Sequence, residues 1–292
     1  MCVALVFSKD RPLQLHTCLT TLCSSTTSTL QKVHVVYVAS KPVFEQGMRK
    51  VQHLHPNVAF RKQTRLSTDL KEIVAQHQEN LILFVVDDMV FFRDLELNKV
   101  EQLLEKDNTI LCFQSRLSKN IKKSFTREES CVVPLLLPSS FPSIRTFFPF
   151  LGDSEWNYPF DLTGGLYRGA DLIEILSLVE ERFGLEMLDH PNLLELYGNK
   201  VLSEDIGFPN SESHLIACPS EPVCTVVTVN RVQEVFANKI YAHLDVDWLA
   251  RRFLEEENNE DFAVDLEWYR NQDFDCVHTK TLKLLGIAPW ES

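Results

Sequence analysis

The chain has 292 residues, and its hydrophobic content of 45% is enough for one large domain or two small ones with a substantial core. The formal net charge is −12 and the pI about 5.2, which argues against partners held by phosphate-backbone electrostatics, such as nucleic acid. No apolar run approaches the roughly 20 residues that a membrane helix requires, so we expect no transmembrane segment. The densest positive cluster, Lys119, Lys122, Lys123 and Arg127, is local and is better explained as a solvated loop than as an anion site.

None of the eight cysteines forms a C-x-x-C pair, which argues against a zinc ribbon. No secretory signal precedes the first strand, so the cysteines indicate a reducing compartment rather than a disulfide framework. We therefore expect a cytoplasmic protein, and we leave open a peripheral position at a membrane surface.

The first part of the chain alternates apolar runs with helical patterns. Residues 2–8 form a continuous apolar run, as expected of a strand that is covered on both faces. The predicted order is a strand at 2–8, a helix at 12–25, a strand at 32–40, a short strand at 57–60, a helix at 66–78 capped by Ser67 or Thr68, and a strand at 80–88. Because buried parallel strands need helical crossovers, this order predicts an α/β domain with a mainly parallel sheet.

The second part is less regular. It is predicted to contain a helix from about 97, a strand at 109–114, long loops within 119–159, helices at 169–184 and 191–201, a strand at 224–230 and a helix at 245–257. Five of the 13 prolines fall within 119–159, which favours loops there.

Two adjacent carboxylates, Asp87 and Asp88, interrupt the apolar stretch NLILFVVDDMVFF. Ligands of parallel sheets lie at the carboxyl ends of the strands, so Ser8, Asp10 and Arg11 should share a rim with this pair. Adjacent carboxylates repel each other unless a proton or a cation neutralises them, and Mg²⁺ or Mn²⁺ bound by one or two carboxylates keeps positions open for phosphate oxygens. The alternative is a pair that caps a turn, but the long apolar runs on both sides favour a site in the fold interior.

These motifs resemble those of GT-A glycosyltransferases. FVVDDMVF resembles their D-x-D region, VFSKDRPLQL their first strand and nucleotide-contacting loop, TDLKEIV a segment of the nucleotide pocket, and EWNYPFDLTGGLYRGADL the acceptor-side loop and helix. PNLLE and VNRVQEVFANK are similar to blocks of a bacterial and viral subgroup in the same order, so the resemblance extends from Val3 to about Glu257. It implies a GT-A, Rossmann-like α/β fold, with a nucleotide-sugar-binding half at 1–118 and an acceptor-side half with C-terminal helices at 119–292 of one continuous domain.

The implied activity is a metal-dependent glycosyltransferase that moves a sugar from a nucleotide-diphosphate donor to a glycan, lipid-linked or protein acceptor. The implied cofactor is Mn²⁺ or Mg²⁺, held by Asp88, with His243 completing the metal shell. Asp87 would be a second ligand or a contact to the ribose, because Asp-Asp-Met departs from a strict Asp-x-Asp. The residues implied in donor binding also include Phe7, Ser8, Arg11, Asp69 and Lys71.

An inverting transferase needs a base that takes the proton of the acceptor hydroxyl. The candidates are Asp161, Glu155 and Asp205, with Asp153 and Glu204 as further acids, and each is also explained as a surface or capping acid. A retaining mechanism would remove the need for this base.

Trp156, Gly164 and Gly165 suit a sugar site, together with Tyr158, because aromatic faces cover a pyranose and glycines permit close approach. Core packing is an equally good explanation of the aromatic residues.

Two other functions stay open. A sugar nucleotidyltransferase uses a similar sheet and acids, but those enzymes commonly carry an early Gly-rich phosphate loop, and SKDRPLQ at 8–14 contains no glycine. A non-catalytic binding module on the same fold would be distinguished by its lack of turnover.

Overall fold

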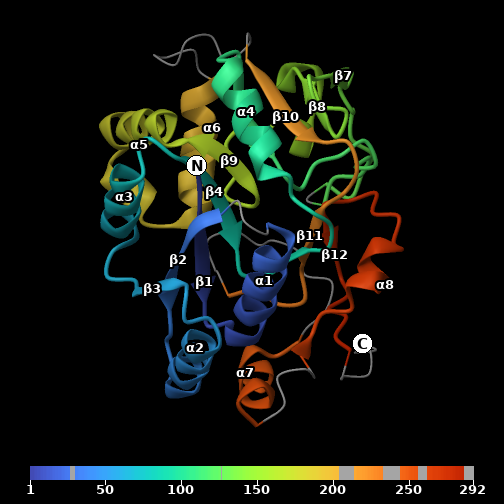
Figure 1. Ribbon diagram of the computed structural model, residues 1–292. Helices are drawn as coiled ribbons and strands as arrows, with labels where there is room; N and C mark the ends of the chain where they lie inside the picture. The colour runs from blue at the N-terminus through green and yellow to red at the C-terminus, as the bar shows by residue number, and fades with distance from the viewer. Residues whose placement is uncertain (27–29, 126, 204–213, 233–243, 256–261, 286–292) are drawn as a thin grey trace.

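The computed structural model describes residues 1–26, 30–125, 127–203, 214–232, 244–255 and 262–285 (Figure 1). Up to residue 114 the elements are β1 (Cys2–Lys9), α1 (Pro12–Ser25), β2 (Leu30–Val38), α2 (Pro42–Leu54), β3 (Ala59–Lys62), α3 (Leu66–Gln76), β4 (Leu81–Val86), β5 (Met89–Phe91), α4 (Leu97–Lys106) and β6 (Ile110–Gln114). They are followed by β7 (Leu137–Pro138), β8 (Ile144–Phe147), η1 (Pro149–Leu151), η2 (Ser154–Asn157), β9 (Gly165–Arg168), α5 (Gly169–Phe183), η3 (Leu185–Leu188), α6 (Pro191–Ser203), β10 (Leu215–Pro219), β11 (Cys224–Val227), α7 (Val246–Glu255), α8 (Leu266–Arg270) and β12 (His278–Thr279).

Within the described residues, nine strands form a central sheet in the order β3-β2-β1-β4-β9-β6-β10-β8-β7. Strands β3, β2, β1 and β4 are parallel to one another, and β10 is parallel to β6. Strand β9 lies between β4 and β6 and is antiparallel to both. The predicted α/β architecture with a mainly parallel central sheet is confirmed. The sheet takes strands from both sides of residue 118, and the division of the chain at that residue stays a prediction.

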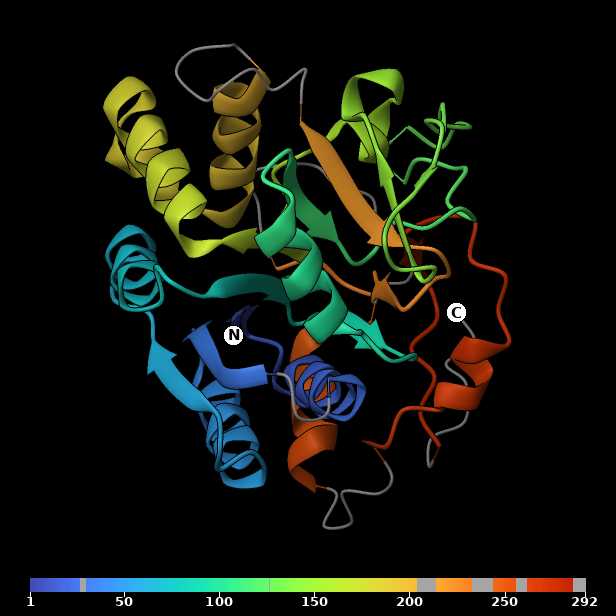
Figure 2. The same cartoon turned by 45° about the horizontal axis from the view of Figure 1, so that its top comes forward.

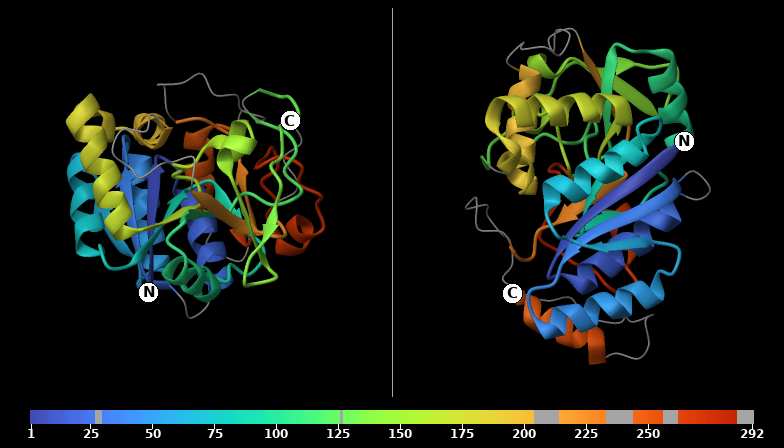
Figure 3. Two further views of the ribbon diagram at one scale, coloured as in Figure 1. Left: turned by 90° about the horizontal axis from the view of Figure 1, so that it is seen from above. Right: turned by 90° about the vertical axis from the view of Figure 1, so that its left-hand side faces the viewer.

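Helices cover both faces of this sheet. In β1, Ala4 and Val6 belong to a core with α1, α2, α4 and α7, whereas Leu5 and Phe7 belong to a core with α3, α5 and α6. Figure 2 shows α1 and α4, which belong to the first core. The right panel of Figure 3 shows α3 and α5, which belong to the second core. Strand β1 is thus buried on both faces, as its unbroken apolar run predicts.

The acid pair forms a turn between two strands that belong to different sheets. Strand β4 pairs with β1 as far as Val86, and the backbone N–H of Asp87 still donates to the Phe7 carbonyl at 3.1 Å. After the turn, β5 pairs antiparallel with β11 in a three-stranded sheet completed by β12. Since β4 and β5 are both buried, hydrophobic residues flank the two carboxylates on each side.

Helix α2 is absent from the sequence prediction. Its interior Gly47 reads as a helix breaker, but the glycine is needed for packing, because a Cβ there would lie 2.5 Å from Cγ of Pro12 in α1. The predicted cap of α3 is also wrong. The helix begins at Leu66 with no side-chain cap from the preceding residue, and Asp69 instead accepts a hydrogen bond from the Thr64 backbone at 2.9 Å.

Among the described residues, no helix combines the length and apolarity needed to cross a bilayer. All eight cysteines lie in described segments and are free thiols in the structure.

Candidate active site

A cleft of about 950 Å³ opens at the carboxyl ends of β1 and β4. The strand ends contribute Phe7, Ser8, Asp87 and Asp88, and Arg11 follows at the start of α1. Other lining residues come from the segment after β6, from the loop and 3-10 helix before β9, and from the start of α6. This is the edge at which open parallel sheets bind ligands.

The first polar group in the cleft is the strand-end cluster, defined as Ser8, Arg11, Asp87 and Asp88. Arg11 Nη1 lies 3.0 Å from Asp87 Oδ1 and 2.9 Å from Asp88 Oδ2. The other oxygen of Asp87 accepts hydrogen bonds from Ser8 Oγ at 2.8 Å and from the Lys9 backbone at 3.3 Å. Asp87 is therefore held from three directions, whereas Asp88 has a partner only for Oδ2 among the described residues.

Burial raises the pKa of Asp87 to about 6, and the charge of Asp88 adds to this effect while Arg11 opposes it. For Arg11, burial would lower the pKa, but the two carboxylates outweigh it and the guanidinium pKa is raised. Its Nη2 also donates to the Asn230 carbonyl at 2.7 Å. One buried arginine thus neutralises one of two adjacent negative charges.

The donor atoms available in this cluster limit how a cation could bind. Hydrogen bonds engage both oxygens of Asp87, and its role as a metal ligand stays a prediction. His243 lies outside the described residues. No group of three or more His, Cys, Asp or Glu in the described segments could hold a metal ion. A Mg²⁺ or Mn²⁺ ion that takes one protein carboxylate and several phosphate oxygens fits here through Asp88.

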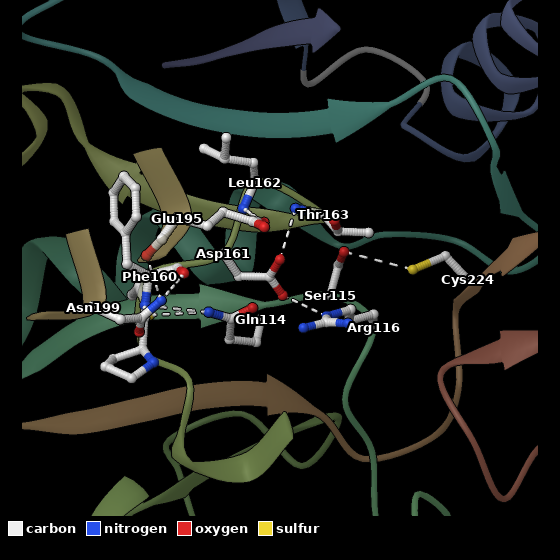
Figure 4. A network of polar contacts seen from close by, with 12 residues as sticks. Gln114, Ser115, Arg116, Phe160, Asp161, Leu162, Thr163, Glu195, Asn199 and Cys224 are labelled. Atoms are coloured by element: carbon white, nitrogen blue, oxygen red, sulfur yellow. Dashed lines mark hydrogen bonds and ion pairs between the residues drawn. The ribbon is translucent and has the colours of Figure 1, made fainter. Parts of the chain in front are cut away.

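The second polar group is the loop–helix cluster, defined as Arg116, Asp161 and Glu195 (Figure 4). Arg116 follows β6, Asp161 lies in the loop before β9, and Glu195 lies on α6. Arg116 Nε donates to Asp161 Oδ2, and the Thr163 backbone donates to Asp161 Oδ1 at 2.8 Å. Glu195 Oε1 accepts from the Leu162 backbone at 2.8 Å, and its carboxyl also forms a hydrogen bond with Asp161.

Burial raises the pKa of Glu195 to about 8, and the neighbouring charge of Asp161 adds to this effect, while the Leu162 N–H and Arg116 oppose it. For Arg116, burial would lower the pKa, but Asp161 and Glu155 outweigh it and the pKa is raised. Glu195 therefore carries a proton near neutral pH. The cluster then holds one negative charge and one positive charge.

Helix α6 holds the loop that carries Asp161. Asn199, one turn after Glu195, donates to the Phe160 carbonyl at 2.6 Å and accepts from its backbone N–H at 3.0 Å. Residues four apart lie on one face of a helix, so Glu195 and Asn199 form hydrogen bonds with neighbouring backbone groups of the same loop. From β9, Tyr167 Oη accepts from the Asp161 backbone at 2.7 Å.

The polar side chains of Glu155, Asn230 and His278 also line the cleft. Glu155 Oε1 accepts from the Phe125 backbone at 2.9 Å, but its Oε2 is buried with no partner in the described part of the chain. The side-chain amide of Asn230 is buried and has no hydrogen-bond partner among the described residues. His278 lies 2.8 Å from Thr228 Oγ1 and stacks on Phe125, and burial, with a contribution from Arg116, lowers its pKa to about 3.

The structure corrects the predicted placement of Trp156. This residue is fully buried, its ring contacts Phe147 edge-on at 5.0 Å, and its indole N–H donates to the Ile121 carbonyl at 3.1 Å. It is a core residue and cannot cover a sugar in the cleft. Tyr158, its neighbour on the other side of Asn157, does line the cleft.

The predicted nucleotide contacts Asp69 and Lys71 also lie away from the cleft. Asp69 is buried at the start of α3, where it caps backbone, and Lys71 pairs with Glu180 of α5. The sequence pattern places both in the first turns of a helix, and the structure shows that this helix faces α5.

Gly164 and Gly165 stand beside the loop–helix cluster but do not line the cleft. Gly164 has a φ of +89°, and a Cβ there would lie 2.3 Å from Ser115 Oγ. A Cβ at Gly165 would lie 2.2 Å from the Asp161 carbonyl. Both glycines are explained by close packing of backbone rather than by contact with a ligand.

The remaining base candidates have different surroundings. Asp161 and Glu155 line the cleft, and Asp153 lies at its edge, where it accepts from the Val132 backbone at 2.8 Å. Asp205 and Glu204 lie outside the described residues. Sequence reasoning does not assign a role to Arg116, Glu195 or His278. Only Glu195 had a signal, because it ends the PNLLE block that carries part of the resemblance.

The chain is homologous to part of a glycosyltransferase. No family model matches it. The bifunctional glycosyltransferase pgtA of Dictyostelium discoideum is 26% identical over 219 residues, which cover 72% of this chain and 28% of that protein. The chain thus spans less than a third of the curated relative.

Likeness to solved structures is partial. S. aureus TarS 1-349 in complex with UDP is 14% identical, with 76% of this chain and 58% of that chain covered and a TM-score of 0.43. The mannosyltransferase PcManGT from Pyrobaculum calidifontis, in complex with GDP-Man and Mn²⁺, is 12% identical, with 41% and 36% covered and a TM-score of 0.30. A cytidylyltransferase from Leptospira borgpetersenii is 10% identical, with 66% and 71% covered and a TM-score of 0.38. These partial matches carry no argument about the donor or cofactor of this chain.

Proposed function

We propose that this chain is a GT-A glycosyltransferase that moves a sugar from a nucleotide-diphosphate donor to a glycan, lipid-linked or protein acceptor. The observation that carries the proposal is one cleft that contains both an arginine-bound acid pair at the strand ends and a second, proton-holding acid pair. A group-transfer enzyme needs the first kind of site for a charged leaving group and the second for a proton. The homology to part of a glycosyltransferase supports this choice of reaction.

In this proposal the strand-end cluster binds the donor. Phe7, Ser8 and Arg11 line the cleft where β1 ends, and the guanidinium of Arg11 fixes the orientation of Asp88. Asp88 would hold Mn²⁺ or Mg²⁺, and such a cation, when bound, supplies a positive charge to the departing diphosphate. Arg11 and Lys9, which line the cleft at the same edge, add positive charge there.

The nucleotidyltransferase alternative is less well supported. Those enzymes need a loop that wraps a triphosphate, and residues 8–14 continue directly into α1 through Pro12 without a glycine. A binding module without catalysis would not need a carboxyl group with a strongly raised pKa in its cleft, such as Glu195.

A cytoplasmic location, with a peripheral position at a membrane surface as its variant, is part of the same proposal. Eight free thiols support a reducing compartment.

The test is a titration of the chain with UDP-, GDP-, CDP- and dTDP-sugars, with added Mn²⁺ and then with a chelator, followed by product analysis. We expect one nucleotide class to bind, the affinity to fall on chelation, and sugar to be released or transferred. Lys71→Ala is a matched control, because its exposed ion pair lies outside the cleft and the variant should keep donor affinity within about twofold. Failure of all four donor classes to bind would remove the proposal.

A further inference from the structure

The acidic side chains of the cleft differ in their hydrogen-bond partners. Both oxygens of Asp161 accept hydrogen bonds, from Arg116 and from the Thr163 backbone. Asp153 is engaged by the Val132 backbone and lies 3.8 Å from Arg127. Glu195 is half-buried on the cleft wall, where its Oε1 accepts from the Leu162 backbone and its carboxyl group also shares a hydrogen bond with Asp161.

We propose that Glu195 accepts the proton of the acceptor hydroxyl and that Asp161 and Arg116 are positioning residues for it. The inference rests on the proposed glycosyltransferase function and deepens it by naming the base. Glu195 is half-buried and lines the same cleft as Asp88. The hydrogen bond from the Leu162 backbone to Glu195, and that from Asn199 to the Phe160 carbonyl, hold this part of α6 against the loop before β9.

The charged and titratable groups that face Glu195 come from four elements. Asp161 precedes β9, Arg116 follows β6, Tyr158 follows η2, and Tyr167 lies in β9. Burial makes the largest contribution to the raised pKa of Glu195. Asp161 raises this pKa further, and Arg116 lowers it. A carboxyl group that titrates near the working pH is suited to act as a general base, because part of it is ionised and its ionised form is strongly basic.

The proposed step is an inverting displacement. The acceptor oxygen attacks the anomeric carbon and forms the new C–O bond, while the bond from that carbon to the diphosphate oxygen breaks. The diphosphate leaves with the bonding electron pair, and the hydroxyl proton passes to Glu195. The step needs no other reactant, and the protonated Glu195 later releases its proton to solvent.

Glu155 provides the matched comparison. It is also a glutamate at the cleft, and no described residue forms a hydrogen bond with its buried Oε2. Its other oxygen accepts hydrogen bonds from Ser124 Oγ and from the Phe125 backbone. A buried oxygen with an open hydrogen-bonding position is suited to receive a hydroxyl donor from a ligand.

The test measures kcat, KM and donor affinity from about pH 6 to about pH 9 for the wild-type chain, Glu195→Gln and Glu155→Gln. We expect kcat of the wild-type chain to rise with pH through about 8, following ionisation of Glu195. Glu195→Gln should lower kcat about 10²–10⁴-fold and remove this rise, with donor affinity unchanged. Glu155→Gln should keep the rise, whatever its effect on KM.

Two more variants separate positioning from structure. Asp161→Asn removes the charge that raises the pKa of Glu195, so the rise in kcat should move to lower pH. Glu195→Asp keeps a carboxyl group and should keep a pH-dependent rise at reduced kcat, which also provides a readout if Glu195→Gln does not fold.

The inference is overturned if Glu195→Gln retains the pH-dependent rise, if Asp205→Asn removes it while Glu195→Gln does not, or if the product keeps the anomeric configuration of the donor. Each of these results requires a wild-type chain that binds and turns over a donor. Failure of the wild-type chain to bind any donor overturns the proposed function instead.

Discussion

The strand-end cluster and the loop–helix cluster each contain two carboxyl groups and one buried arginine, but the charges are distributed differently. Arg11 bonds both Asp87 and Asp88 through one nitrogen, so both carboxylates are stabilised in the ionised form by the same group. Arg116 bonds Asp161 alone, and Glu195 is stabilised by keeping its proton. The comparison indicates that the position of the arginine decides which acid pair carries a fixed charge and which carries an exchangeable proton.

The largest expected effect comes from removing the arginine of the loop–helix cluster. Arg116→Leu leaves Asp161 buried without its ion pair, and loss of one partner of a buried pair costs about 3–5 kcal/mol in the free energy of unfolding. Urea denaturation of the variant measures this loss. Arg127→Leu, at an exposed arginine 3.8 Å from Asp153, is the control and should change stability by less than about 0.5 kcal/mol. Equal losses in the two variants would show that Arg116 does not stabilise Asp161.

The second test asks whether Asp87 contributes mainly to stability and Asp88 mainly to activity. Asp87→Asn places an amide N–H among three hydrogen-bond donors and should destabilise the chain by about 1–3 kcal/mol. Asp88→Asn disturbs one bond to Arg11 and should cost less stability, but it should reduce sugar transfer about 10²-fold or more. Thermal unfolding and donor turnover of both variants check this division. An Asp88→Asn variant with full turnover would contradict the role of Asp88 at the leaving group.

The last test concerns how the stability of the chain depends on pH. The folded-state pKa of Glu195, about 8, lies above its ordinary value of 4.5, so between these values the folded chain holds a proton that the unfolded chain releases. Stability should therefore fall as pH rises through this window and level off above it. Asp87 should act in the same direction in a lower window, from 3.8 to about 6.

Urea midpoints of the wild-type chain and Glu195→Gln, measured from about pH 5 to about pH 9, isolate the first contribution. The variant should gain stability relative to the wild-type chain as pH rises towards 8. A constant difference over this range would mean that Glu195 does not titrate differently in the folded and unfolded chains.

The strands and helices that continuous patterns mark could be predicted from the sequence. The apolar run at 2–8, the helix that ends at Gly184 and the acids at the end of β4 are local signals, and the structure contains each of them. Helix α2 and strand β9 were missed because their reasons are tertiary: Gly47 makes room for Pro12, and β9 fits between two strands that are remote in sequence.

The same distinction applies to the cleft. Asp87 and Asp88 are neighbours in the chain, so their pairing is visible in the sequence, whereas Asp161 and Glu195 meet only after α6 packs on the loop before β9. Trp156 had the residue type and sequence neighbours of a sugar-binding residue, and only packing against Phe147 shows that it is core.

The reversed direction of β9 has a consequence for how this cleft could diversify. Strands β6 and β9 are neighbours in the sheet, and the segment 115–164 that joins them supplies the edge strands β7 and β8. The Ser115 N–H donates to the Gly164 carbonyl at 2.9 Å, so the two ends of this segment are hydrogen-bonded to each other. The loops of this segment can be lengthened, shortened or exchanged while strands β1 to β4 keep their register. If the proposed function holds, changes of acceptor preference by loop grafting should be sought in this segment, with the strand-end cluster left intact.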